Sequence, residues 1–178
     1  MKRLMFSFLL GLSYLMAQGQ TLPVDTATKK ISFTEKIELA GLSKDELYKR
    51  AKNLGIAGKN TVKDDLANGT YQYKGQFKVS YPAPQPGLQH TGVVDFVVTI
   101  QVKDGRYRYV ITDFVHSSDK ANGGKLEGNL PECGKHTLTL AGWGTIKKSV
   151  KEQTDKLIAN IKAKMAGTEN TATPGNDW

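Results

Sequence analysis

Residues 93–116 constrain the fold of this chain more than any other segment, because two long runs of β-forming residues flank the dipeptide Asp104-Gly105. Asp-Gly is a preferred two-residue turn between antiparallel strands. If Lys103 pairs with Arg106, one face of the resulting hairpin is almost entirely apolar, so it belongs to a core. The pairs predicted on that face are Val102 with Tyr107, Ile100 with Tyr109, Val98 with Ile111, Phe96 with Asp113, and Val94 with Val115.

Patterns that precede this hairpin predict a strand and a helix. Apolar residues alternate with polar ones over residues 31–39, which indicates a half-buried strand. Ser43 is followed three residues later by Glu46, and this capping box predicts the start of a short amphipathic helix. Gly55 is a natural stop for that helix.

The remaining patterns predict two more strands and a second helix. Asn68-Gly69 indicates a hairpin turn between a weak strand over residues 61–67 and a stronger one over 70–81. Residues 117–140 are rich in Gly, Asn and Lys without a period, which predicts a mobile or poorly packed excursion. Apolar residues at helical spacing over 143–165 predict the last helix. The fold class predicted is α+β: a single domain of strand, helix, four strands and helix, with both helices on one face of an antiparallel sheet.

The two ends of the chain differ from the domain between them. Residues 1–19 have a basic start, an apolar run and a small-residue exit, which is the layout of a secretory signal peptide cleaved between Ala17 and Gln20. A membrane anchor is the alternative, but the apolar run is shorter than the roughly 20 residues that cross a bilayer. We expect a signal peptide over residues 1–19, a linker over 20–29, one domain over 30–166 and a disordered tail over 167–178.

Cysteine usage and charge limit the classes to which the chain can belong. Cys133 is the only cysteine, so an internal disulfide is excluded and no lipid-bearing cysteine lies near the expected cleavage site. The formal net charge is +8, and the lysines are scattered along the chain. Export argues against nucleic acid as a partner. We therefore expect a soluble periplasmic or extracellular protein, whose charge serves solubility or an anionic membrane surface, glycan or protein.

Three segments together resemble a family of exported bacterial proteins classified as a domain of unknown function with a TBP-like fold. They are residues 31–35, residues 41–52, and residues 99–109 followed by Thr112-Asp-Phe114. The resemblance spans residues 30–165 and implies the same order of strands and helices as the patterns above. It implies no activity, since it carries no catalytic or ligand-binding residues over to this chain.

The sequence shows no recognisable catalytic constellation. Its three histidines, His90, His116 and His136, are not placed by any pattern beside a nucleophile. Cys133 lies three residues before His136, and Glu132 and His116 could complete a metal site, but a structural zinc site needs about four ligands and no second pair is evident. We predict no catalytic residue, no metal, no cofactor and no enzymatic activity.

Glu35 and Asp113 fall on the apolar sides of otherwise regular strands. Burial of an unpaired carboxylate is costly, so each needs an explanation. One interpretation places them at sheet margins or gives them hydrogen-bond donors. The other makes Glu35 and Asp113 a structural polar cluster beneath the helices that determines how the helices dock.

Basic and amide side chains on the polar sides of the predicted strands form a candidate interaction surface. If those strands are neighbours, the side chains make a shallow basic face suited to an acidic partner or an anionic glycan. The alternative is an ordinary solvated sheet face. The residues of this candidate surface are Lys74, Lys78, Gln101, Arg106 and Arg108.

These observations predict an exported, non-catalytic binding or interaction module of the cell envelope. The alternative is a structural or assembly accessory of an envelope complex that presents residues 117–140 to a partner, and an unrecognised enzyme is the third hypothesis. The partners expected are an envelope protein or an anionic glycan. We expect no nucleic acid partner and no transmembrane span after processing.

Overall fold

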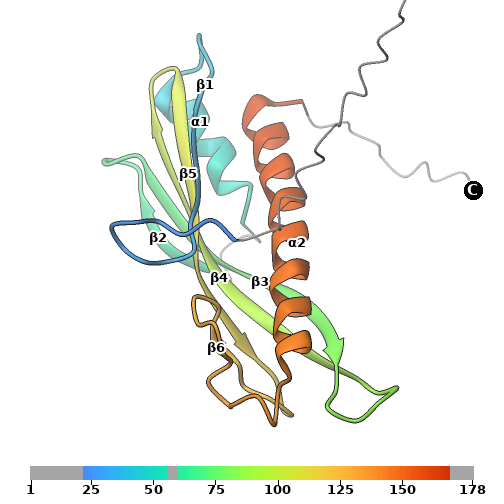
Figure 1. Ribbon diagram of the computed structural model, residues 1–178. Helices are drawn as coiled ribbons and strands as arrows, with labels where there is room; N and C mark the ends of the chain where they lie inside the picture. The colour runs from blue at the N-terminus through green and yellow to red at the C-terminus, as the bar shows by residue number, and fades with distance from the viewer. Residues whose placement is uncertain (1–21, 56–59, 169–178) are drawn as a thin grey trace, which may run out of the picture.

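The computed structural model describes residues 22–55 and 60–168, which form a six-stranded antiparallel sheet and two helices. The strand order is β1-β5-β4-β3-β2, and β6 pairs with β5. Figure 1 shows both helices on the same side of the sheet. The predicted α+β fold is therefore confirmed, with the short strand β6 added to it. The elements are β1 (Phe33–Glu38), α1 (Lys44–Lys52), β2 (Thr61–Asp65), β3 (Thr70–Pro82), β4 (Gln89–Lys103), β5 (Arg106–Ser117), β6 (Gly124–Lys125) and α2 (Leu140–Ala166).

The two predicted terminal segments lie largely outside the described residues. This holds for the expected signal peptide, residues 1–19, and for residues 169–178 of the expected tail. Gly167 has a left-handed backbone and caps α2, with its N–H directed at carbonyl groups of the last helical turn. The helix therefore ends where the tail was predicted to begin.

Residues 22–29, which the sequence predicts as linker, form a turn beside β1. The backbone N–H of Asp25 donates to the carbonyl of Lys30 at 2.9 Å, and Val24 forms a β-bridge with Ile31. Leu22 packs against the core. The segment is thus attached to the sheet by backbone hydrogen bonds and by one apolar side chain.

The capping residue predicted for the first helix is confirmed. Ser43 has an extended backbone, and its side-chain oxygen accepts the N–H of Glu46 at 3.2 Å. The carboxylate of Glu46 forms an ion pair with Arg50 one turn later, at 3.0 Å. The helix ends at Lys52 with Asn53 as its C-cap, before the predicted stop at Gly55.

The predicted register of the long hairpin is correct from its turn to the middle of the strands. Lys103 pairs with Arg106, and Val98 pairs with Ile111. Beyond this point, Val97 pairs with Thr112 but Asp95 pairs with Val115, so β5 contains one residue more than β4. This is a β-bulge, which places two residues of one strand opposite a single residue of the other.

The bulge reverses the faces of the last residues of β5. Asp113 has a positive φ of 60°, a left-handed conformation that Asp tolerates better than most residues. Phe114 and His116 are fully buried as a result, whereas Val115 is 37% exposed. The predicted pairs of Phe96 with Asp113 and Val94 with Val115 are therefore wrong, because that register assumed an unbroken ladder.

Residues 117–140 pack closely against the rest of the domain, contrary to the prediction of a mobile or poorly packed excursion. Leu126 and Leu138 are completely buried. The carbonyl oxygen of Gly128 accepts hydrogen bonds from the indole of Trp143 at 3.0 Å and from Lys147 at 2.8 Å. Helix α2 therefore holds this segment, through residues that the local glycine-rich composition does not reveal.

Within the described part of the chain, neither helix has the combination of length and apolar character that membrane crossing requires.

Candidate functional site

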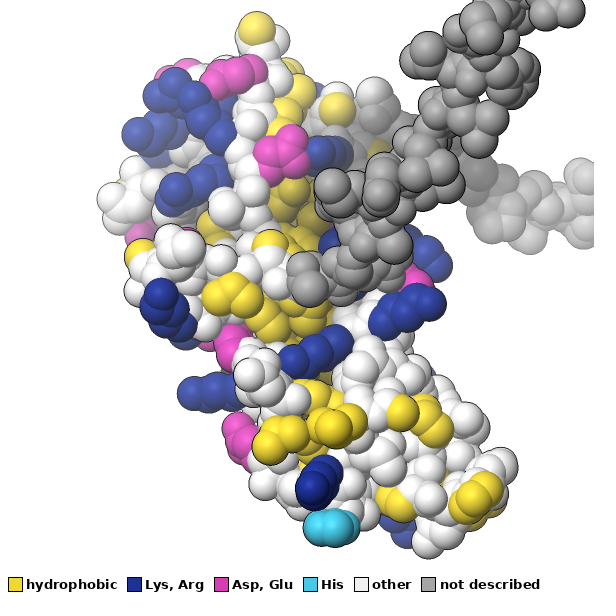
Figure 2. Space-filling model, viewed as in Figure 1, with side chains coloured by type: hydrophobic (Ala, Val, Ile, Leu, Met, Phe, Trp, Pro, Cys, Tyr) yellow, Lys and Arg dark blue, Asp and Glu magenta, His cyan; other side chains and the backbone are white. Residues whose placement is uncertain are grey.

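The face of the sheet opposite the helices carries a row of polar side chains near the β4–β5 turn. The strand register aligns Lys36 of β1 with Arg108 of β5, Arg108 with Gln101 of β4, and Gln101 with Thr70 of β3. Residues that are directly opposite on neighbouring strands share one face of the sheet. In Figure 2, Lys and Arg side chains gather at the upper left, over this end of the sheet.

The next row towards the turn adds two further cations. Glu38 pairs with Arg106, and Arg106 pairs with Lys103. Lys36, Lys103, Arg106 and Arg108 line one shallow pocket together with Gln101. We call these five residues the hairpin-end cluster.

Glu38 is the one carboxylate aligned with the hairpin-end cluster in the described sheet, opposite Arg106 and beside Lys36. Lys36 forms an ion pair with Glu38 at 2.7 Å, and the hydrogen bond from Lys36 lowers the pKa of Glu38. Arg108 donates from Nε and Nη2 to the amide oxygen of Gln101, at 3.0 and 2.5 Å. Gln101 is neutral, so this contact orients the guanidinium without compensating its charge.

The structure brings together only part of the candidate surface drawn from the sequence. Gln101, Arg106 and Arg108 meet in the hairpin-end cluster, whereas Lys74 pairs with Val97, four residues further along β4. Four residues of strand correspond to about 13 Å. Lys78 lies opposite Val93, another four residues away. Both lysines are on the same face as the cluster but outside its pocket.

Sequence reasoning missed Lys36 and Lys103 as members of the cluster. Lys103 was visible as the residue opposite Arg106, and its place beside the turn was a usable signal. Lys36 had no such signal, because its neighbour Arg108 is 72 positions away and joins it only through the pairing of β1 with β5. The order of strands in the sheet determines this contact.

Glu35 links β1, β5 and α2. Its carboxylate accepts a hydrogen bond from the hydroxyl of Tyr109 at 2.9 Å and forms an ion pair with Lys162 at 2.7 Å. The hydrogen bond from Lys162, and to a smaller extent the one from Tyr109, lowers the pKa of Glu35. Burial and the hydrogen bond to Glu35 raise the pKa of Tyr109. The Glu35 side chain is 46% exposed, so it lies at the margin of the helix-covered face.

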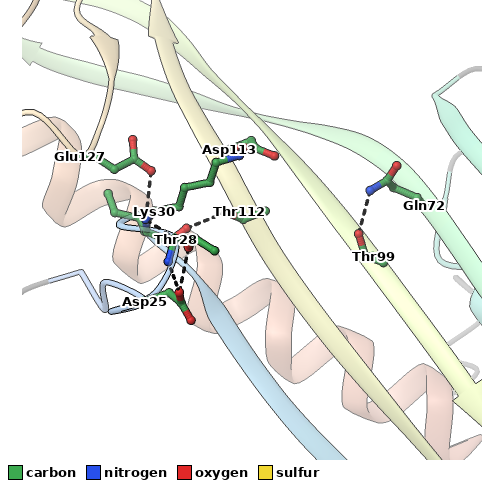
Figure 3. A network of polar contacts seen from close by, with 9 residues as sticks. Asp25, Thr28, Lys30, Gln72, Thr99, Thr112, Asp113 and Glu127 are labelled. Atoms are coloured by element: carbon green, nitrogen blue, oxygen red, sulfur yellow. Dashed lines mark hydrogen bonds and ion pairs between the residues drawn. The ribbon is translucent and has the colours of Figure 1, made fainter.

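Asp113 is on the surface, and its predicted place on the apolar face is wrong. The bulge turns its side chain outwards, where it is 44% exposed and pairs with Lys30 at 2.5 Å. Figure 3 shows this ion pair beside the hydrogen bond from Thr112 to the backbone carbonyl of Ile31. Asp113 and Glu35 have no partner in common, so the two carboxylates do not form one polar cluster beneath the helices.

His116 is the buried polar side chain of β5. Its Nδ1 accepts the backbone N–H of Gly123 at 3.1 Å, and its ring packs edge-on against Tyr81 and Trp143. The neutral ring therefore carries its proton on Nε2, which has no hydrogen-bond partner among the described residues. Burial lowers the pKa of His116, because a charged imidazole would lose its hydration there.

Acidification is expected to destabilise the protein through His116. The folded pKa is below the unfolded value of about 6.5, so the unfolded chain binds this proton more tightly. The free energy of unfolding therefore keeps its full His116 contribution above about pH 6.5. It decreases as the pH falls from there towards the lower folded pKa. Melting temperatures at about pH 7.5 and about pH 5.5 should differ less for His116→Asn, whose side-chain oxygen can still accept the Gly123 N–H. Equal pH-dependent losses in both proteins would contradict this prediction.

Cys133 and His136 do not form a metal centre with the other two residues considered for it. His116 is bonded to Gly123, and the carboxylate of Glu132 accepts the backbone N–H of Lys125 at 3.1 Å. Within residues 22–55 and 60–168, the structure contains no group of three or more His, Cys, Asp or Glu side chains that could hold a metal ion.

Comparisons with known proteins agree with this fold. Residues 33–117 match the family described as a domain of unknown function (DUF4468) with TBP-like fold. The matched segment runs from β1 to the end of β5 and therefore includes the hairpin-end cluster. The resemblance expected from the sequence is confirmed. No curated protein matches the chain.

Two bacterial crystal structures have the same fold. A TBP-like protein from Parabacteroides distasonis superimposes with a TM-score of 0.59 and 19% sequence identity, over 81% of this chain and 96% of that one. A DUF4468 family protein from Bacteroides ovatus gives a TM-score of 0.56 and 14% identity, over 78% of this chain and 89% of that one. At such identities the likeness establishes the fold alone.

Proposed function

Because a domain of unknown function with a TBP-like fold brings no activity with it, we propose a function from the site itself. The chain is an exported, non-catalytic binding module of the cell envelope that acts through its open sheet face. The observation that carries this proposal is the hairpin-end cluster, in which four cations line one pocket on the face opposite the helices. Such a concentration of one charge attracts and orients acidic partners.

Sequence and contacts support the other parts of the proposal. The basic start, apolar run and small-residue exit of residues 1–19 support export. One of the three histidines, His116, is fully buried and bonded to a backbone amide, so it is out of reach of a substrate, and this supports the non-catalytic part of the proposal. The envelope location is part of the proposal, and it is supported by the expected export together with the basic surface of the hairpin-end cluster.

Charge reversal on the open face is expected to abolish capture of the partner. The tagged full chain is crosslinked in its native envelope and purified, as wild type and as the Arg106→Glu/Arg108→Glu variant. The matched control, Lys49→Glu/Lys156→Glu, makes the same change in net charge at exposed positions on α1 and α2. A partner retained by the control and lost from the face variant supports the proposal, and equal retention by all three proteins contradicts it.

A second candidate function is a structural or assembly accessory that presents residues 117–140. It is favoured by Leu130 and Leu140, which are 58% and 56% exposed although the segment around them is packed. Exposed leucines of this kind serve contacts with other proteins when they form part of a larger apolar patch. A partner lost on Leu130→Asp but retained by the Arg106→Glu/Arg108→Glu variant would favour this second function.

A further inference from the structure

Positive charges in the hairpin-end cluster lie close enough to repel one another. Lys103 and Arg106 are direct cross-strand partners, and like charges in that position destabilise a strand pair. Arg106 also faces Glu38 on β1, but the Glu38 carboxylate forms its ion pair with Lys36 at 2.7 Å. Lys103 and Arg106 form no ion pair within the described part of the chain, and Arg108 is bonded to a neutral amide. The single carboxylate of Glu38 faces four cations, so an anion from outside the chain would reduce the remaining repulsion, and the arrangement favours a bound negative group.

Hydroxyl and amide groups surround these cations on the open face. The row beyond Arg108 aligns Thr34, Val110, Thr99 and Gln72 across four strands. Gln72 donates to the hydroxyl of Thr99 at 2.9 Å, as Figure 3 shows, and this hydrogen bond holds both side chains in place. These groups can exchange hydrogen bonds with a ligand that has its own hydroxyls.

The aromatic side chains of the central strands point the other way. Tyr71, Tyr73, Tyr107 and Tyr109 are buried under the helices, together with Phe96 and Phe114. Their rings are therefore not available as platforms for bases of single-stranded nucleic acid or as aromatic anchors for a protein partner. Recognition at this face relies on charge and hydroxyl groups instead.

We propose that the open face binds an acidic glycan. Lys103, Arg106 and Arg108 take its carboxylate groups, and the adjoining threonines and glutamines take its hydroxyl groups. Gln101 is a positioning residue, because its amide oxygen holds the Arg108 guanidinium at 3.0 and 2.5 Å. This inference rests on the proposed function and names the ligand class of the same site.

Fluorescein-labelled polygalacturonate is the probe, and its binding to the full chain is measured by anisotropy. We expect binding that weakens between about 20 and about 200 mM NaCl, because salt screens exposed charges. Affinity should fall about tenfold or more in Arg106→Glu/Arg108→Glu and by less than about twofold in Lys49→Glu/Lys156→Glu. Neutral dextran should not bind. Polygalacturonate binding that Arg106→Glu/Arg108→Glu leaves unchanged would overturn the inference.

Gln101→Glu separates ligand binding from folding. The new carboxylate has the same shape as the amide and pairs with Arg108, so affinity for polygalacturonate should fall severalfold while the midpoint of urea unfolding is unchanged or higher. Equal or tighter binding of labelled poly-L-glutamate would overturn the glycan assignment in favour of an acidic protein. If polygalacturonate fails to bind but the envelope partner is still lost from Arg106→Glu/Arg108→Glu, the glycan inference fails and the proposed function stands.

Discussion

Replacement of Phe114 by alanine is expected to lower the free energy of unfolding by about 3–5 kcal/mol, the usual cost for a buried phenylalanine. Phe114 is completely buried, and its ring lies 5.9 Å from that of Phe33 and 5.8 Å from that of Phe96. The substitution leaves a cavity between β1, β4 and β5 that the surrounding strands cannot fill. Urea denaturation of wild type and variant measures the difference.

Val115→Ala is the matched control for Phe114→Ala, and the comparison of the two variants tests whether β5 bulges at Asp113. An unbroken hairpin would bury Val115 against Val94 and expose Phe114, whereas the bulge leaves Val115 37% exposed. Its loss should change stability by no more than about 0.5 kcal/mol, as for other surface positions. Asp113→Asn should change it by less than about 1 kcal/mol, because an exposed ion pair contributes little. A large loss at Val115 with a small one at Phe114 would show that the bulge is misplaced.

Trp143→Ala is expected to have a similarly large effect, about 3–5 kcal/mol. The indole is 2% exposed and donates to the carbonyl of Gly128 at 3.0 Å. It also lies so close to Gly123 that a Cβ there would be 2.5 Å from the ring. Loss of the ring removes a buried contact between α2 and residues 117–140, so amide exchange in that segment should accelerate more than in β3 and β4.

The hydrogen bond of Trp143 can be separated from its packing. Trp143→Phe retains most of the ring but lacks the N–H donor. Because Lys147 still donates to the Gly128 carbonyl, the substitution should cost only about 0.5–1.5 kcal/mol, the net contribution of one hydrogen bond. Leu140→Ala, three residues earlier on α2 and 56% exposed, should change stability by less than about 0.5 kcal/mol. Unaltered amide exchange in residues 117–140 of Trp143→Ala would contradict the role given to the indole.

Part of the candidate site was predictable because it is local. Gln101, Arg106 and Arg108 belong to one hairpin, so its turn and its alternation place them on one face. Lys36 was not predictable in this way, since it reaches the cluster across β1 and β5. The charge of the pocket is therefore a property of the assembled sheet.

The bulge left a signal in the sequence that the alternation obscured. Asp113 interrupts the apolar side of β5, and Phe114 directly after it puts a large ring on the polar side. Two successive residues on the wrong side indicate an inserted residue more simply than a buried carboxylate does. Tyr107, Tyr109 and Ile111 follow the regular pattern before the bulge, so the unbroken register was correct only up to that point.

The sequence by itself determined the elements of this protein, namely the β4–β5 hairpin, the capped start of α1 and the apolar stripe of α2. These depend on turn residues, capping side chains and periodicity, all of which act between residues close in the chain. Only the tertiary structure decided which strands are neighbours, whether Asp113 is an inserted residue or a buried carboxylate, and how Trp143 and Lys147 hold residues 117–140. Those features arise because the whole core must be buried at once, and the free energy of that burial comes from contacts between distant parts of the chain.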